Sequence, residues 1–374
     1  MQDEIRTIVQ KRNDHEHRVL APGSRPADFI AFAHWEQSLD TLRIKRCARL
    51  KIPHVTSAHA SQARILNIFT RGTERHQGSG AIWRAYLAYA GKIRATKRWR
   101  KVMAQALRMR PTDAELWVMA GRRAARNGDM GGARAFFMRG CRFCDGEGLW
   151  VEYARCELEW LARIEAKTKG KKGVSPLLGD RVDEGDEIRF DDDEDGDGDE
   201  DDSILLPEPS AAQEKTRALT RAAAQTLDQK SPAMDGAIPR AIFDISRKQA
   251  FFGPSTAEAF FDLFASSSAA SHRAALAQHV LDAMSELYPT HPATSSCYVR
   301  QPVVGVDPRK AEFAAGLREV LQRLKGAVEI VEDRRSLAEK IGAWVDGLLA
   351  VGELDAGLRT VLEHTKKKVG ADLG

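Results

Sequence analysis

Two cysteines spaced as a Cys-x-x-Cys pair are the residues of this chain best suited to metal or redox chemistry. Cys141 and Cys144 could ligate zinc as thiolates or cycle between dithiol and disulfide. A structural zinc site needs about four ligands, and the sequence has no second Cys-x-x-Cys. A thioredoxin-like dithiol follows a strand, whereas this pair ends a predicted helix. The pattern favours buried or half-buried thiols, with no metal and no cofactor.

An acidic string, DDDEDGDGDEDD over residues 191–202, resembles the start of a calcium loop. Asp193, Asp195, Asp197 and Gly198 fall at loop positions 1, 3, 5 and 6. Position 12 should be Glu, but it is Ile204, and no amphipathic helices flank the string. A solvated run of charge is therefore the favoured interpretation.

Recognisable catalytic motifs are absent from the sequence. It contains no GxxxxGK[ST], HExxH, GxSxG or GxGxxG. The closest histidines, His15 and His17, lie in a polar stretch and are expected on a solvated face. No catalytic residue and no small-molecule substrate are predicted, so the chain is not expected to be an enzyme. A helical-repeat enzyme with an unrecognised site is the alternative of a different class, and nothing in the residues supports it.

The 374-residue chain is a basic block, an acidic string and a neutral block. Its net charge of +4 divides into +17 over residues 1–172, −13 over 173–202 and 0 over 203–374. Such asymmetry suggests that the N-terminal half meets an anionic partner. No apolar run approaches the 18 residues typical of a membrane helix. The N-terminus is too charged for a secretory signal, so an intracellular protein without a membrane is expected.

Basic residues gather at two places in the N-terminal half, and such clusters can neutralise RNA phosphates. The alternatives are a solvated helix face or a surface for an acidic protein partner. Trp99 lies inside the second cluster, where a ring could stack on a base. The first group is Arg43, Lys45, Arg46, Arg49 and Lys51, and the second is Lys92, Arg94, Lys97, Arg98, Arg100 and Lys101.

The elements that must position these residues come from an internal repeat. Four segments share the frame aromatic, x, x, aromatic or Ala, followed by Glu or Ala at position +7. These positions lie on one helix face. Successive tryptophans are 34 and 33 residues apart, whereas the first interval, 54, needs an insertion. The frame residues are Phe29, Phe32, Glu36, Trp83, Tyr86, Ala90, Trp117, Ala120, Ala124, Trp150, Tyr153 and Glu157.

A second element precedes each tryptophan by 13 or 14 residues. Phe69, Met103 and Phe137 begin it, and Gly72, Ala106 and Gly140 follow three residues later. A small residue there lets a neighbouring helix approach closely. Each unit is therefore a predicted helical hairpin, and the tryptophans are expected mainly in the core.

The chain is predicted to be all-α. An N-terminal hairpin domain (1–165), a disordered charged linker (166–236) and a C-terminal helical-repeat domain (237–370) are expected. The C-terminal helices are predicted over 240–251, 254–265, 272–287, 308–327, 337–349 and 353–369. Residues 297–306, CYVRQPVVGV, contain Pro302 and Gly305 and are predicted to form an extended connection.

A hairpin of this length that opens with Trp-x-x-Tyr and ends near Arg-Gly resembles the half-a-TPR (HAT) repeat. More specifically, the chain resembles the U3 small nucleolar RNA-associated protein 6 family, as a filamentous-fungal member. The likeness covers about 1–165 and 237–368. It is carried by DEIRTIVQKRNDHEH at 3–17, LDTLRIKRCARLKI at 39–52, RGCRFCDGEGLWVEYARCELEWLARI at 139–164, and the segments 237–264, 279–302 and 337–368.

The resemblance implies a HAT solenoid and a non-catalytic scaffold subunit of the nucleolar small-subunit processome. It implies that the protein forms a subcomplex with WD40-propeller proteins. It also implies that the protein acts with U3 snoRNA in pre-rRNA processing and 18S rRNA maturation. RNA would be met indirectly or through the basic clusters. Family members usually begin with a further helical stretch, which the resemblance implies this chain lacks. A HAT-repeat scaffold of mRNA splicing or 3′-end processing is the related alternative, although splicing HAT proteins usually carry many more repeats.

Overall fold

The repeat frame forms alternating helices in the protein's computed structural model, which describes residues 2–51, 57–170, 236–267, 271–350 and 355–373. Over these residues the chain forms α-helices and one short 3-10 helix, with no strand. The all-α helical-repeat prediction is therefore confirmed. Contacts group the helices into two compact units, and the boundary falls inside α6 (Ala114–Arg126), between Ala120 and Gly121. Within the same residues, no helix is long and apolar enough to cross a membrane.

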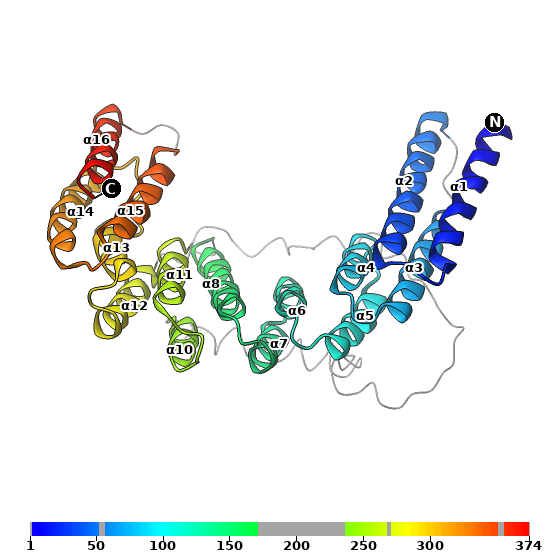
Figure 1. Cartoon of the computed structure of the whole chain (residues 1–374), viewed down its shortest axis with the longest axis horizontal. Coiled ribbons are helices and arrows are strands. Elements are labelled where there is room, and N and C mark those ends of the chain that lie inside the picture. The colour runs from blue at the N-terminus through cyan, green and yellow to red at the C-terminus, as the bar shows by residue number, and fades with distance from the viewer. Residues whose placement is uncertain (1, 52–56, 171–235, 268–270, 351–354, 374) are drawn as a thin grey trace. The chain divides into compact units, whose positions relative to one another are not determined.

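The first unit is built of antiparallel helical neighbours (Figure 1). Helix α2 packs against α3, α3 against α4, and α4 against α5. In this unit the aromatic frame residues lie in α2, α4 and α6, and the second element lies in α3 and α5. The unit contains α1 (Gln2–Leu20), α2 (Pro26–Leu50), α3 (Ser57–Arg75), α4 (Gly80–Lys92), α5 (Thr96–Met109) and the first half of α6 (Ala114–Arg126).

The two elements of a repeat meet through stacked rings. In the first unit, Phe69 of α3 stacks on Tyr86 of α4 with ring centroids 5.5 Å apart and planes 12° apart. His15 of α1 stacks in the same way on Phe32 of α2, at 5.2 Å and 4°. Both pairs are separated by 17 residues in sequence. Helix α1 therefore occupies the place of a second element, with an imidazole where the repeat has a phenyl ring.

The expectation of a solvated face is wrong for His15, although His17 is exposed. His15 lies against Phe32 and also against Trp35, with ring centroids 5.3 Å apart. Burial lowers the pKa of His15, because the imidazolium ion would lose water there. The neutral ring is therefore the form that this packing favours.

The small residue of the second element also has a packing role. Gly72 is buried, and a Cβ there would lie 3.0 Å from the ring of Phe29 and closer still to Ile82. Glycine thus allows α3 to lie close to its neighbours α2 and α4.

The second unit continues the hairpins and then adds the C-terminal helices. Phe137 of α7 stacks on Tyr153 of α8, at 5.1 Å and 8°. Helix α8 packs against α10 and α11, which follow it in the chain after residues 171–235. The unit contains α7 (Met130–Phe143), α8 (Glu147–Gly170), α10 (Ala237–Ser246), α11 (Pro254–Ala265), α12 (Arg273–Leu287), α13 (Pro292–Arg300), the 3-10 helix η4 (Gln301–Val303), α14 (Ala311–Ile330), α15 (Arg334–Leu349) and α16 (Ala356–Leu373).

The predicted linker, 166–236, lies almost entirely outside the described residues, as does the acidic string. The predicted boundaries at 165 and 237 therefore stay a prediction.

The predicted extended connection over 297–306 is wrong in its first part. Helix α13 runs through Arg300, and η4 follows it immediately. The side chains of Cys297 and Val299 are fully buried, so packing of α13 against α11, α12, α14 and α15 favours the helix. Gly305, with φ of +79°, then ends the segment in the left-handed conformation that glycine accepts readily.

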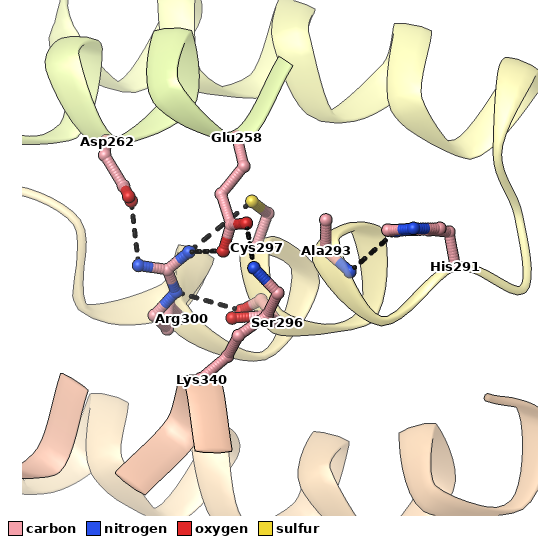
Figure 2. A network of polar contacts seen from close by, with 8 residues as sticks. All are labelled: Glu258, Asp262, His291, Ala293, Ser296, Cys297, Arg300 and Lys340. Atoms are coloured by element: carbon pink, nitrogen blue, oxygen red, sulfur yellow. Dashed lines mark hydrogen bonds and ion pairs between the residues drawn. The ribbon is translucent and has the colours of Figure 1, made fainter. Parts of the chain in front are cut away.

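An ionic network joins three helices of the C-terminal block (Figure 2). Arg300 of α13 binds Glu258 of α11 at 3.2 Å and Asp262 of α11 at 2.8 Å. Lys340 of α15 binds the second oxygen of Glu258 at 2.5 Å. The side chains of Arg300 and Glu258 are only 12% and 13% exposed. The network is therefore a structural cross-link inside the second unit.

Candidate functional site

The frame residues singled out in the sequence lie in the core, except Ala124, which is half-buried. Buried aromatics are Phe29, Phe32, Phe69, Trp83, Tyr86, Trp117, Phe137, Trp150 and Tyr153, together with Ala90, Ala120 and Gly140. These side chains position the helices and leave binding to residues on the outer faces.

The glutamates at position +7 are buried ion-pair partners. Glu36 is 1% exposed, and Arg12 of α1 binds both its oxygens, at 2.7 and 3.1 Å. Glu157 is 1% exposed, and Arg134 of α7 binds it in the same fashion, at 2.7 and 2.9 Å. Two parallel N–H···O bonds satisfy each buried carboxylate. The sequence did not predict these two arginines as partners of the glutamates, because they lie outside the aromatic frame.

The cysteine pair has the environment of ordinary thiols. Cys144 is buried and Cys141 half-buried, and neither is in a disulfide. Burial raises the pKa of Cys141 to about 12, so the thiol, which is a poor nucleophile, dominates at neutral pH. Among the described residues, no three His, Cys, Asp or Glu side chains are grouped to hold a metal ion.

The first basic cluster lies at the C-terminal end of α2, and two of its five residues are engaged internally. Arg43 pairs with Asp40 at 2.7 Å, and Arg46 pairs with Glu4 of α1. Lys45, Arg49 and Lys51 are exposed, and no ion pair to another described residue holds them. Basic residues at a helix C-terminus favour the helix dipole, so this cluster also has a structural explanation.

Apolar side chains are interleaved with this cluster. Leu42, Ile44 and Leu50 of α2 are 53%, 45% and 59% exposed. A surface of exposed leucine and isoleucine among basic side chains fits a protein partner better than it fits a phosphate backbone.

The second basic cluster surrounds the start of α5. Here the helix dipole does not explain the positive charges. Lys97 and Arg98 lie in the first turn of α5, which has no acidic residue and no side-chain cap. Positive charge there opposes the helix dipole, at a cost of about 0.3–1 kcal/mol per charge. Arg94 has a φ of 58°, a left-handed conformation in which glycine is usual.

The charges of this second cluster are available for an anion. Lys92, Arg94, Lys97, Arg100 and Lys101 are exposed, and Arg98 is half-buried. Within the described part of the chain, no carboxylate pairs with any of the six. Trp99, in contrast, is only 6% exposed and packs inward with Val102 and Met103. The cluster therefore presents charge without a ring on which a base could stack.

A family match and individual relatives point to the same kind of protein. Residues 1–69 match the family described as U3 small nucleolar RNA-associated protein 6. The fission yeast Schizosaccharomyces pombe protein of that name is 32% identical over 171 residues, which cover 45% of this chain and 35% of the relative. The mouse homologue is 24% identical over 50% of this chain and 32% of the relative, and the human homologue 26% identical over 41% and 27%.

The chain thus matches about a third of the length of these relatives. The matched family region consists of α1, α2 and most of α3, the helices in which the His15 stack and the Arg12–Glu36 pair occur. The family match over residues 1–69 and the three relatives show the same similarity, which is to U3 small nucleolar RNA-associated protein 6.

Proposed function

We propose that this protein is a non-catalytic scaffold subunit of the small-subunit processome, which acts with U3 snoRNA in pre-rRNA processing and small-subunit maturation in the nucleolus. Similarity to a family named for association with U3 small nucleolar RNA is the observation that carries the proposal. The architecture supports it, because stacked helical hairpins bury a continuous core and leave long outer faces for partners.

The two basic clusters are assigned different partners. The α2 cluster, with its exposed apolar side chains, contacts a protein subunit of the same assembly, for which WD40 propellers are the expected class. The α5 cluster, which lacks both internal ion pairs and exposed large apolar side chains between residues 92 and 101, contacts RNA phosphates. Frame residues such as Trp83 and Trp117 hold the helices in place and touch neither partner.

Affinity purification of the tagged full chain from cells tests the assignment. We expect U3 snoRNA and propeller subunits to co-purify, and U3 snoRNA to be enriched over an unrelated small nuclear RNA measured in the same eluate. Recovery of splicing or 3′-end cleavage factors in place of propeller proteins and U3 snoRNA would contradict the proposal and favour the alternative HAT-repeat assemblies.

Lys97→Glu should change stability and RNA affinity in opposite directions. The carboxylate favours the dipole of α5, so the free energy of unfolding should rise by about 0.5 kcal/mol. Loss of one phosphate contact should weaken single-stranded RNA binding roughly tenfold at 50 mM salt, and should reduce the slope of log affinity against log salt by about 0.7. Thermal melting and fluorescence anisotropy measure the two effects on one preparation.

Lys325→Glu is the matched control, because Lys325 is exposed in the middle of α14, outside both clusters. It makes the same change in net charge and should leave the salt slope unaltered. If both variants weaken binding equally, the effect is one of overall charge, and the α5 cluster has no specific contact.

A further inference from the structure

A notch between α6 and α8 in the second unit concentrates positive charge around a tryptophan. The cavity has a volume of about 80 Å³. Arg122 and Arg126 line it from α6, and Glu159, Trp160 and Arg163 line it from α8. It shares no residue with either basic cluster. The sequence frame gave no hint of it, since none of these side chains is a frame residue.

The arginines of the notch are only partly neutralised by the protein. Arg122 pairs with Glu152, but no ion pair to a described residue holds Arg126 or Arg163. Arg163 only donates to the carbonyl oxygen of Ala125, at 3.4 Å. Glu159 also lines the cavity and offsets part of the charge. Three guanidinium groups around one small cavity repel one another unless an anion joins them.

The size and the donors of the notch fit one oxyanion group. A volume of 80 Å³ is that of about three liquid waters, which is enough for a phosphate but not for a nucleobase. The planar guanidinium fork matches phosphate oxygens in a bidentate manner. A carboxylate would satisfy the same arginines, so the charges alone do not choose between RNA and an acidic peptide.

Trp160 favours RNA over an acidic peptide. It is half-buried and lines the same cavity, so part of its ring surface is open beside the arginines. An indole adjacent to phosphate-binding arginines is the combination by which proteins hold single-stranded nucleic acid, with the base stacked on the ring. A peptide carboxylate would bind the arginines but would not stack on the indole ring.

We infer that the notch binds single-stranded RNA, with one phosphate inside the cavity between Arg122, Arg126 and Arg163 and the adjoining base outside it, stacked on the open part of the Trp160 ring. The inference deepens the proposed function, on which it rests for the presence of RNA, and it adds a base contact that the α5 cluster lacks. The stacking makes the site tolerant of sequence, because every base has a face to stack.

Binding of a fluorescein-labelled oligouridine to the purified full chain tests the site. Arg126→Gln/Arg163→Gln should weaken binding at least tenfold and reduce the salt slope by about 1.4, or about 0.7 for each lost phosphate contact on a single strand. Trp160→Leu should weaken binding by roughly five- to tenfold without changing the slope, and Trp160→Phe should restore most of the affinity.

The control variant is Arg335→Gln/Arg359→Gln, which removes two exposed arginines from α15 and α16 and should bind like the wild type. Circular dichroism verifies that each variant is folded. Equal affinities for the notch and control variants would overturn the inference. So would notch variants that bind oligouridine normally but lose a glutamate-rich peptide, since the site would then serve a protein.

The two proposals can fail separately. If U3 snoRNA does not co-purify but oligouridine binding still depends on Trp160, the proposed function is wrong and the site stands. If U3 snoRNA co-purifies from cells and the notch variants bind normally, the site is wrong and the function stands.

Discussion

Phe137→Ala is expected to lower the free energy of unfolding by about 3–5 kcal/mol, as large-to-small changes of buried aromatics do. The Phe137 side chain is fully buried, and its ring stacks on Tyr153. Gly121 of α6 also lies against this ring, and an added Cβ there would be 2.5 Å from it. The ring therefore fills a space bounded by two helices, and alanine would leave a cavity that they cannot close fully.

Phe143→Ala is the matched control, since Phe143 is on the same helix but 52% exposed. Its substitution should cost no more than about 0.5 kcal/mol. Urea denaturation of the full chain, followed by circular dichroism, measures both variants. Equal costs would show that the stacked ring is not the anchor of this hairpin.

Substitution of the neighbouring Gly121 tests the packing of Phe137 further. Gly121→Ala alone should cost about 1–3 kcal/mol, because the new methyl group meets a ring that has no free space around it. In the Phe137→Ala background the same methyl group enters the cavity, so the double variant should cost less than the sum of the two. Additive costs would show that Gly121 and Phe137 do not share one packing site.

Arg300→Ala is expected to cost about 3 kcal/mol, because it leaves the buried carboxylate of Glu258 with Lys340 alone. Arg300 joins α13 to α11 through ion pairs with Glu258 and Asp262 (Figure 2). Its Nε also donates a hydrogen bond to the carbonyl oxygen of Ser296. Asp262 is 52% exposed and can turn to water, so most of the cost falls on Glu258.

Replacing both charges separates the cost of an orphaned charge from the value of the pair. Arg300→Met/Glu258→Leu should be clearly more stable than Arg300→Ala, since apolar groups of similar volume often replace a buried ion pair at little cost. Arg335→Ala is the surface control, because Arg335 is 80% exposed in its pair with Glu339, and it should cost under about 1 kcal/mol. A double variant less stable than Arg300→Ala would mean that the charges themselves stabilise the block.

Local sequence predicted the helices correctly where the burial of one helix face is enough to specify them. The spacing of Phe69, Trp83, Trp117 and Phe137 identified the helices and the buried face, because apolar side chains at i, i+3 and i+7 can be covered only from one side. The same reasoning missed α1, since His15 replaces the ring that the frame requires, and only the stack on Phe32 revealed its place. It also failed at α13, where Pro302 and Gly305 suggested an extended segment but the burial of Cys297 favoured a helix.

The sequence by itself determined the class of the protein: an all-α repeat with a basic N-terminal half and a likeness to one family. Tertiary structure decided which charges are available. Arg43 and Arg46 are paired internally, whereas Lys97 and Arg100 have no described carboxylate partner. It also brought Arg126 and Trp160, 34 residues apart, to one notch. The reason is physical, because helix type follows from local periodicity, whereas ion pairs and cavities depend on which faces of distant helices come into contact.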